Sequence, residues 1–419
     1  MSIVKACAVM LPRSRALSAV RIRRASWAWQ SSAHALPSCG LVLIALACSG
    51  GGGDGGPTQP PKDKAEIQIT TPTTTIAVGE AFRFSVQAKD AAGNFVIDGA
   101  GATFTTDRTA ILFIEGDRAV VGQAPGVAHV MGKIGNATTS VAITVVSPSP
   151  FELTVFPDSD VPLTLQRAAS RAIARWRRVI RSNVGPSVDV RSTDDLCGAL
   201  PAGSTVPIAG IRIRLRLVPN LGVPAAGGPC VVRTETGLAL TGLVSFNTTN
   251  PFINDQAYAD RTMIHEIGHV LGIGTWWFTP IGRKYYPDTA LSDPYFNGPS
   301  AVAGFIAVGG AGYLGRKVPV EVPGGTAAPG SHWRGSVVGP TLEVMQAGSK
   351  VSQFTVNALA DMGWSVDSSS ADIYALPTPT VASLQVASPP RLGDEVLRAS
   401  TSVSAKGMMT SILPARRRP

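Results

Sequence analysis

His265, Glu266 and His269 form an H-E-x-x-H pattern inside an apolar stretch of the chain, 262–272. Two residues four apart on an α-helix lie on the same face, about 6 Å apart along its axis. His265 and His269 can therefore hold one metal ion with two imidazole nitrogens, and zinc is the metal that such a pair favours. Glu266 lies beside the first ligand, where its carboxylate reaches a metal-bound water without taking a coordination position. It is the candidate general base.

A catalytic zinc ion usually has three protein ligands and one open position for water. In the most compact extension of the pattern the third ligand would stand at position 275, but that residue is Thr275. The chain has five histidines, and His332, in the sequence Ser-His-Trp, is the one that follows the pair. Glu321 and Glu343 are the alternative third ligands, because other zinc enzymes use a downstream glutamate. Neither glutamate lies in an obvious second metal-binding helix.

Two separate blocks of the sequence resemble the leishmanolysin family of metzincin peptidases. The first block is 261–274. The second is 331–364, which contains Ser-His-Trp, then Leu-Glu-Val-Met and an apolar stretch ending in Gly-Trp. The resemblance, which extends over 160–367, implies a long insertion after the second histidine, with His332 as the third zinc ligand and Met345 as the methionine turn below the metal. Without it, His332 reads as a loop histidine and Met345 as a core residue.

The resemblance implies a zinc-dependent endopeptidase that hydrolyses peptide or protein substrates. Three neutral imidazoles leave the charge of a single zinc ion largely undiluted, which lowers the pKa of a bound water towards about 7. Glu266 would accept the proton of that water and deliver it to the leaving amine. The strand expected at 242–247 would be an edge strand that pairs with an extended substrate. The alternative is a surface adhesin or binding module on a catalytically degenerate zincin fold, against which the intact Glu266 argues.

The formal net charge of +9 comes from the two ends of the chain. Residues 1–48 contain six Lys or Arg and no acidic residue, and residues 368–419 contain six basic against three acidic residues. The region between them is neutral and offers no folded basic patch, so we expect no nucleic-acid partner. The tail, 368–419, is rich in Ser, Thr, Ala and Pro, and its composition predicts disorder.

The N-terminal residues 1–48 have the features of an export signal. Five arginines precede an apolar run, 41–47, that is too short to span a membrane. Cys48 and the Gly- and Pro-rich linker after it, 49–64, resemble a bacterial lipoprotein with a lipidated cysteine and a flexible tether. We expect an exported protein that is lipid-anchored to a bacterial envelope membrane and faces the periplasm or the exterior. Simple secretion is the alternative, and a start at Met10 would shorten the signal.

Cys197 and Cys230 are the only cysteines after Cys48. An exported protein meets an oxidising compartment, in which a single pair is expected to form one disulfide. The loop that it closes would hold about 33 residues, which corresponds to about 3 kcal/mol in the chain-entropy model. Two buried free thiols are the alternative.

The segment 65–148 predicts short β-strands. Apolar residues from Phe82 to Ala88 alternate with polar ones, and the sequence Asp-Ala-Ala-Gly-Asn at 90–94 is typical of a hairpin turn. Several short strands with glycine turns indicate a β-sandwich. The segment resembles bacterial immunoglobulin-like modules, which space other domains from a cell surface.

The segment 150–367 carries the elements that would position the metal site. A helix is expected from Asp160, with apolar residues at three- and four-residue steps and with Arg171, Arg175 and Arg178 on its other side. The alternation of Ile or Leu with Arg over 211–217 predicts a strand with one buried and one solvated, basic face. The expected fold class is therefore multidomain, an all-β immunoglobulin-like sandwich followed by an α+β metzincin-type zincin domain.

Overall fold

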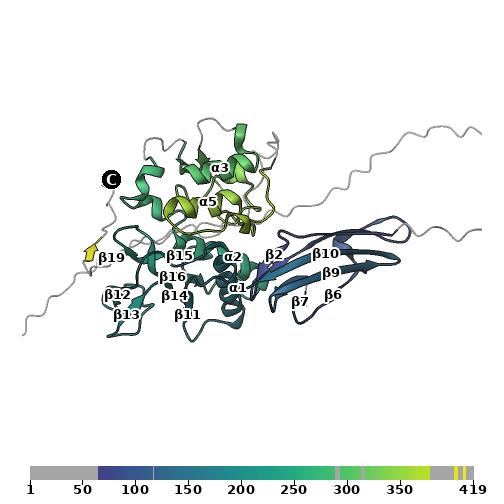
Figure 1. The fold of residues 1–419 in the computed structure, drawn as a ribbon, viewed down its shortest axis with the longest axis horizontal. Helices are drawn as coiled ribbons and strands as arrows, with labels where there is room; N and C mark the ends of the chain where they lie inside the picture. Colours follow the sequence, from purple (N-terminus) through teal and green to yellow (C-terminus); the bar gives the residue numbers. More distant parts are fainter. Residues whose placement is uncertain are drawn as a thin grey trace, which may run out of the picture. The chain divides into compact units, whose positions relative to one another are not determined.

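The computed structural model describes residues 65–116, 118–287, 293–312, 317–325 and 327–377, and two short strands at 401–403 and 409–411. The chain divides into two units, Met1–Pro60 and Pro61–Pro419, and all described residues belong to the second. The predicted export signal, Cys48 and the linker lie outside the described residues. None of the described helices is long and apolar enough to cross a membrane. The described part is rich in β-strands and has few helices (Figure 1).

Residues 65–148, here called the N-terminal module, form short strands that pair in three small sheets. The sheets have the strand orders β1-β4-β5, β2-β10-β9-β6 and β3-β8-β7. Their pairs are antiparallel except for β2 and β10, which are parallel. The elements are β1 (Glu66–Thr70), β2 (Thr75–Ala77), β3 (Ala81–Arg83), β4 (Ser85–Lys89), β5 (Phe95–Val96), η1 (Ile97–Gly99), β6 (Thr103–Thr106), β7 (Leu112–Glu115), β8 (Ala119–Gly122), β9 (Gly126–Ile134) and β10 (Ala137–Val146).

The alternating apolar side chains of these strands form the core of the module, as predicted. Phe84, Val86 and Ala88 are buried in one cluster with apolar residues of the other strands. The predicted hairpin turn at 90–94 is confirmed, since it joins β4 to its antiparallel neighbour β5. Asp90 accepts hydrogen bonds from the backbone N–H groups of Ala92 and Asn94 at 2.9 and 2.8 Å. A short acidic side chain thereby satisfies turn donors that no strand reaches.

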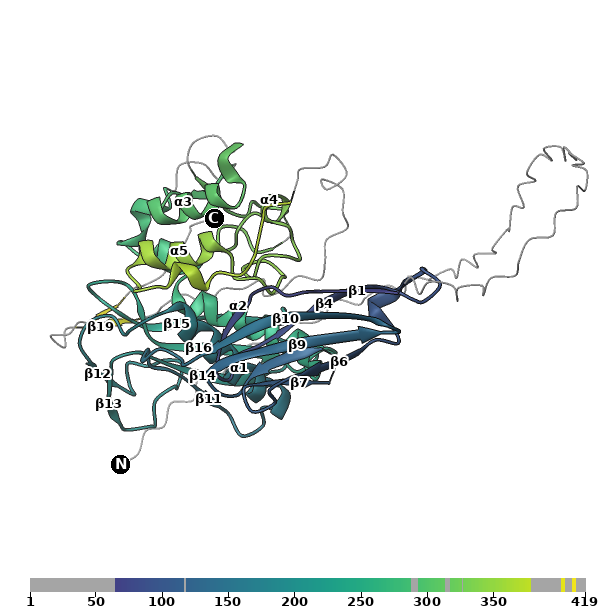
Figure 2. The same ribbon diagram turned by 45° about the vertical axis from the view of Figure 1, so that its right-hand side comes forward.

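Residues 150–377 together with the strands β19 and β20, here called the C-terminal domain, are built around a mixed sheet of strand order β11-β14-β16-β15-β19-β20. β11, β14 and β16 run parallel, and β15 is antiparallel to β16. The helices α1 and α2 lie side by side next to this sheet (Figures 1 and 2). The elements are β11 (Leu153–Pro157), α1 (Leu163–Val179), β12 (Val188–Arg191), β13 (Thr205–Ile208), β14 (Ile211–Val218), β15 (Ala225–Arg233), β16 (Ala239–Asn247), α2 (Gln256–Leu271), β19 (Thr401–Val403) and β20 (Met409–Ser411).

The strand at 242–247 is an interior strand, contrary to the expectation from the resemblance. It belongs to β16, which lies between β14 and β15 and is paired on both edges. The turn after Arg233 folds β16 back antiparallel to β15, which pairs with β19 on its other edge. All residues of β15 are buried, and its sequence, which contains Gly-Gly-Pro, lacks the alternation that marks a half-buried strand. Periodicity therefore does not reveal it.

Helix α1 differs from the expectation at its start and on one face. It begins at Leu163 after Pro162, so Asp160 does not cap it. Its apolar face is buried as predicted. Arg171, Arg175 and Arg178 are also buried, with exposed fractions of 5, 4 and 8 %. Their ionic partners come from distant segments, and a helical pattern carries no information about those partners.

The basic face of β14 is only partly solvated. Ile211, Ile213 and Leu215 are buried as predicted, and the arginines between them are half-buried. Arg214 donates two hydrogen bonds of 2.8 Å to the carboxylate of Asp158. Arg214 is therefore ion-paired, and we assign no substrate role to this strand.

The rest of the C-terminal domain consists of short helices around a cluster of aromatic rings. Trp333 packs against Trp277, Phe296 and Phe354 with ring centroids 5.4, 6.1 and 5.6 Å apart. α3 and α5 lie next to each other in both views (Figures 1 and 2). The elements are η2 (Trp276–Phe278), η3 (Gly282–Tyr285), β17 (Tyr295–Phe296), α3 (Pro299–Ala307), η4 (Gly310–Gly312), β18 (Val318–Pro319), α4 (Gly335–Val338), α5 (Gln353–Met362) and η5 (Ser368–Ser370).

The folded domain extends beyond residue 367, where the disordered tail, 368–419, was expected to begin. Ser370 of η5 is buried. The Tyr374 hydroxyl donates to the Val338 carbonyl at 2.5 Å, and the Leu376 N–H donates to the Val308 carbonyl at 2.8 Å. Composition averaged over the whole tail hides these packed residues. The remainder of the tail, apart from β19 and β20, lies outside the described residues.

Candidate metal centre

Helix α2 places the H-E-x-x-H residues in the interior. The Asp255 side chain caps the helix by accepting a hydrogen bond from the Tyr258 N–H at 2.7 Å. Gly272 ends it with φ of 123°, a value that L side chains rarely adopt. The Trp176 indole of α1 donates to the Ile264 carbonyl at 3.1 Å, which fixes the two helices against each other. The part of α2 that carries His265 and His269 is thus held at its cap, at its end and against α1.

The structure brings His265, His269 and His332 together at one point. Their Nε2 atoms lie 3.0 Å apart for His265 and His269, 3.1 Å for His265 and His332, and 3.2 Å for His269 and His332. All three side chains are buried. Tetrahedral ligands at the zinc–nitrogen distance of about 2.0–2.1 Å would stand about 3.3 Å apart. The donor set therefore fits zinc in both chemistry and spacing.

The outer nitrogens of the three rings have hydrogen-bond acceptors. Nδ1 of His265 lies 2.6 Å from the Val344 carbonyl oxygen, and Nδ1 of His269 lies 2.7 Å from that of Ile273. Nδ1 of His332 lies 3.2 Å from the Ala328 carbonyl oxygen and 3.1 Å from the Ser331 hydroxyl, which itself donates to the Ala328 carbonyl. Carbonyl oxygens only accept, so each Nδ1 carries the proton and each Nε2 keeps a free lone pair. This is the tautomer that a metal ligand needs.

Burial also keeps these rings uncharged. It lowers the pKa of His265 to about 4 and the pKa of His332 to about 3. The pKa of His269 is well below its usual value because of burial first and the neighbouring His265 and His332 second. At neutral pH all three imidazoles are therefore neutral, which is the state that binds zinc.

Glu266 is a buried carboxylate without a partner among the described residues. Its side chain is fully buried, and neither of its oxygens has a hydrogen-bond partner. Burial raises the pKa of Glu266 to about 8. Buried carboxylates normally accept hydrogen bonds, and an orphaned one needs an explanation. A water molecule bound to a metal at the histidine cluster is a donor that would satisfy it.

Met345 is fully buried and lies directly against helix α2 at Gly268. A Cβ atom added to Gly268 would stand 2.6 Å from the Met345 sulfur, so glycine at this position makes room for the methionine. Gly268 immediately precedes the second histidine. Nothing in the sequence predicts the contact of Gly268 with Met345 beyond the glycine itself.

Glu343 and Glu321, the alternative third ligands, are both occupied with other contacts. The buried Glu343 carboxylate accepts hydrogen bonds from the Ser352 and Thr355 hydroxyls at 2.8 and 2.5 Å and from the Met345 N–H at 2.6 Å. Burial raises its pKa to about 7 despite these hydrogen bonds.

Glu321 accepts from the Gly335 N–H at 3.0 Å and from the Gln346 side chain at 3.2 Å. Within the described residues, neither glutamate belongs to the cluster of possible metal ligands that His265, His269 and His332 form.

Cys197 and Cys230 form a disulfide in the structure, with their Cα atoms 6.0 Å apart. The bond joins the loop after β12 to the buried strand β15. Asp195 lies close to the two sulfurs and accepts a hydrogen bond from the Thr241 hydroxyl at 2.9 Å. With both sulfurs in the disulfide, this second group of potential ligands offers no thiolate for a metal. Cys48 lies outside the described residues.

Comparison with known proteins finds no matching family model and no matching curated protein. Solved structures match over small parts of the chain. The intimin mutant of EHEC O157:H7 is 12% identical over 19% of this chain and 45% of its own, with a TM-score of 0.15.

Two structures of the S-layer protein SbsC also match. Domains 5-6 are 22% identical over 23% of this chain and 54% of that chain, with a TM-score of 0.18. The longer rSbsC(31-844) is 19% identical over 22% of this chain and 17% of that chain, with a TM-score of 0.17. This chain thus covers little more than half of these structures at most.

Proposed function

We propose that the C-terminal domain is a zinc-dependent endopeptidase of the leishmanolysin-like metzincin type. The single observation that carries this proposal is the convergence of three buried, neutral imidazoles within 3.2 Å of one another beside the orphaned carboxylate of Glu266. Structural zinc sites use four protein ligands, whereas catalytic sites use three and keep one position open. Three histidines with a neighbouring base fit the catalytic kind.

His265, His269 and His332 would hold the ion, and zinc bound there would supply a Lewis acid that polarises a peptide carbonyl and lowers the pKa of a water molecule. Glu266 would hold the proton taken from that water and pass it to the leaving amine. Its pKa of about 8 refers to the protein without a cation, and a nearby positive charge would lower it, so that the side chain is ionised and able to accept the proton.

The environment of Glu266 supports a role as base rather than as ligand. Helical geometry turns its side chain about 100° away from that of His265, so the carboxylate is beside the ion rather than on it. The Val344, Ile273 and Ala328 carbonyls keep the three rings in fixed orientations through the Nδ1 atoms. The residues around the site thus prepare one geometry in advance.

We also propose that the enzyme is exported and held at a bacterial envelope membrane through lipidation of Cys48. The support is the sequence of residues 1–64, with its basic segment, short apolar run, cysteine and Gly- and Pro-rich linker. The disulfide between Cys197 and Cys230 is consistent with an oxidising compartment. Peptide or protein segments are the proposed substrates.

The test compares the full-length protein with its Glu266→Gln variant in a broad peptide-library digest with zinc supplied. Gln keeps the shape of the side chain but cannot accept the proton, and general-base contributions are about 10²- to 10⁴-fold. We expect the variant to keep about one zinc per chain and to lose activity by that factor. Glu66→Gln, in the exposed ion pair with Lys89 of the module, is the matched control.

If the wild-type protein binds zinc but cleaves no peptide in the library, the peptidase proposal fails. A surface adhesin or binding module on a degenerate zincin fold is then the remaining interpretation. If Glu266→Gln loses zinc together with activity, Glu266 is a ligand, and its assignment as base fails instead.

A further inference from the structure

Four arginines follow one side of α1, at positions 167, 171, 175 and 178, and are here called the arginine stripe. Steps of four, four and three residues place them within about 80° of the helix circumference. Their exposure decreases along the helix, from 53 % for the Arg167 side chain to 6, 4 and 5 % for the other three. Buried guanidinium groups require ionic partners, because an unpaired buried charge is strongly destabilising.

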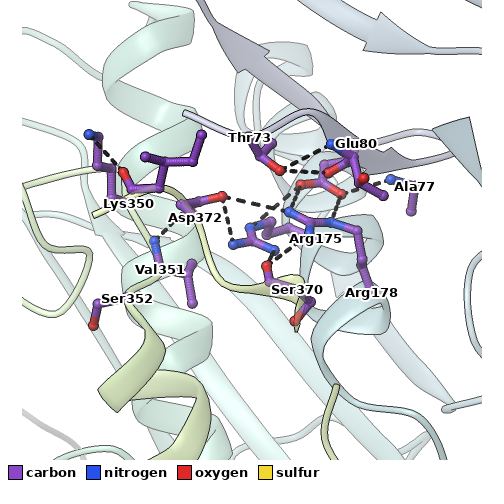
Figure 3. Close-up of polar contacts among 12 residues, drawn as sticks. Thr73, Ala77, Glu80, Arg175, Arg178, Lys350, Val351, Ser352, Ser370 and Asp372 are labelled. Carbon is purple, nitrogen blue, oxygen red and sulfur yellow. Dashed lines mark hydrogen bonds and ion pairs between the residues drawn. The ribbon is translucent and has the colours of Figure 1, made fainter. Parts of the chain in front are cut away.

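The C-terminal half of the stripe, Arg175 and Arg178, is neutralised by two acidic residues from different parts of the chain (Figure 3). Arg178 donates two hydrogen bonds to the carboxylate of Glu80, at 2.8 and 3.0 Å. Arg175 lies 3.5 Å from Glu80 and 3.0 Å from Asp372. Both arginines also donate to the Ser370 carbonyl, at 3.1 and 2.8 Å. Two cations thus face two anions in a buried cluster.

Glu80 belongs to the N-terminal module, between β2 and β3, and its carboxylate also accepts from the Ala77 N–H at 2.9 Å. Its side chain is 3 % exposed. Burial alone would raise the pKa of Glu80, but Arg178 and Arg175 bring that pKa below its usual value. The carboxylate is therefore ionised in the folded protein and is the shared counter-ion of both arginines.

The N-terminal half of the stripe, Arg167 and Arg171, is also paired with acidic residues from the module and from the C-terminal domain. Arg171 pairs with Glu115 of strand β7 in the module and donates to Asp260 of the metal helix α2 at 2.7 Å. Arg167 lies 3.1 Å from the same Glu115. Arg171 therefore connects the module, α1 and α2 through one side chain.

The cluster of Arg175, Arg178, Glu80 and Asp372 is also hydrogen-bonded to the segment that follows Val344. The Asp372 carboxylate accepts from the Val351 N–H at 2.8 Å, and the Asp372 N–H donates to the Val351 carbonyl at 2.9 Å. The neighbouring Lys350 carbonyl accepts from the Val344 N–H at 2.8 Å, and the Val344 carbonyl accepts from His265 at 2.6 Å. A short chain of hydrogen bonds thus leads from Asp372 to a candidate metal ligand.

We propose that the arginine stripe is a docking surface for this chain's own N-terminal module, with Glu80 and Glu115 as the two anchoring residues. The module is then a fixed structural partner of the C-terminal domain, in contrast to the spacer that its resemblance implies. The Ile373 N–H also donates to the Pro72 carbonyl of the module at 2.7 Å, and a cavity of about 380 Å³ lined by Phe82, Arg83, Ile264 and Lys350 lies beside this contact. We assign the main part of the attachment to the ion pairs, and the proposal is independent of any peptidase activity.

The test measures thermal unfolding of the full chain by calorimetry, with Glu80→Ala against Glu66→Ala as the matched control. Glu66 pairs with Lys89 inside the module at 2.7 Å and is exposed. Loss of Glu80 leaves two buried guanidinium groups with one anion, so we expect the unfolding temperature to fall by about 5–15 °C. We expect a change of less than about 2 °C for the control, as for an exposed pair. The wild-type module and C-terminal domain should unfold in a single transition.

A second variant covers the case in which Glu80→Ala does not fold. Glu80→Gln keeps the volume and removes the charge, and we expect faster amide hydrogen exchange in α1 and in 368–373 than in the wild type, without a change in Glu66→Gln. Failure of Glu80→Gln to fold while Glu66→Gln folds also supports the proposal. Unchanged exchange or unfolding temperature in the Glu80 variants would overturn it, as would separate unfolding of the two parts in the wild type.

Discussion

At the residue scale, His332 completes the candidate site. Its Nε2 lies 3.1 and 3.2 Å from those of His265 and His269, so removing it leaves two ligands on one helix. We expect His332→Ala to lower the zinc content and the peptidase activity together, by at least the 10- to 100-fold typical of disturbed zinc sites. Metal analysis after dialysis checks this. His129→Ala, on the surface of the module, is the control, and full zinc occupancy with full activity in His332→Ala would remove this residue from the site.

The buried histidines also predict how stability depends on pH in the metal-free protein. Their folded pKa values, about 4 for His265 and about 3 for His332, are below the usual 6.5. The unfolded chain therefore binds more protons below pH 6.5. The stabilising contribution is complete above that pH and is lost as the pH falls towards 4 and then 3. Each group changes the unfolding free energy by up to about 1.4 kcal/mol per pH unit.

Urea unfolding of chelator-treated protein between pH 7 and pH 4.5 measures this slope. His332→Ala should have a smaller slope than the wild type, because one titrating group is gone. Glu266 acts in the opposite direction, between about pH 4.5 and 8, and it does so in both proteins. Its folded pKa of about 8 lies above the usual 4.5, so its contribution is present at low pH and is lost as the pH rises through 8. Equal slopes for the two proteins below pH 6.5 would contradict the prediction.

Gly268 offers a test of the contact below the metal helix. An Ala in place of Gly inside a helix usually stabilises by up to about 1 kcal/mol. Here the added Cβ would stand 2.6 Å from the Met345 sulfur, so we expect Gly268→Ala to destabilise by about 1–3 kcal/mol instead. Urea unfolding checks the sign. The double variant with Met345→Ala should lose less than the sum of the two single variants, and additive losses would show that the two residues do not press on each other.

The site was predictable from sequence where its residues are local. His265, Glu266 and His269 share one helix, and helical spacing alone places them together. His332 follows His269 by 63 positions, and its place depends on the whole segment between them, so only the resemblance pointed to it. The occupied contacts of Glu321 and Glu343 depend on Gln346, Ser352 and Thr355 and could not be inferred from spacing.

At the scale of elements, the loop 343–350 connects the base of the site to α5. Glu343 ties it to Ser352 and Thr355 at the start of that helix, and the Val344 carbonyl accepts from His265. We expect Glu343→Ala to lower the affinity for zinc by about 10- to 100-fold, because the acceptor of a ligand proton moves. Competition with a chelator measures the affinity. Glu152→Ala, at an exposed position before β11, is the control, and unchanged affinity would show that the loop holds without Glu343.

The sequence pattern predicts the elements that have a regular apolar periodicity. It does not predict the features that depend on partners far away in the chain. The apolar face of α1, the alternation in β14 and the hairpin turn at 90–94 are as predicted. The pattern does not predict β15, because both of its faces are buried and it contains Gly-Gly-Pro. The pattern also does not predict that the arginines of α1 are buried, because their partners Glu80, Glu115 and Asp372 lie far away in the chain.

At the scale of the whole molecule, the net charge of +9 has little to do with the folded part. The region 49–367 is neutral, and four arginines of α1 and Arg214 of β14 are paired with acidic residues. The distribution of charge therefore still predicts no nucleic-acid partner for the folded part. The excess charge lies in the terminal segments, where the signal and tail are proposed.

The last prediction concerns where the molecule is held. Cys48 lies between a short apolar run and a Gly- and Pro-rich linker, and we propose that it is lipidated after export. Each buried CH₂ of a lipid chain adds about 0.8 kcal/mol of membrane affinity, so an acylated cysteine holds the chain at a membrane that no described helix could span. Cys48→Ala should therefore move from the membrane fraction to the soluble fraction with its peptidase activity intact. Cys39→Ala, within the predicted signal, is the matched control and should stay with the membrane. Cys48→Ala that remains at the membrane would show that another part of the chain anchors it.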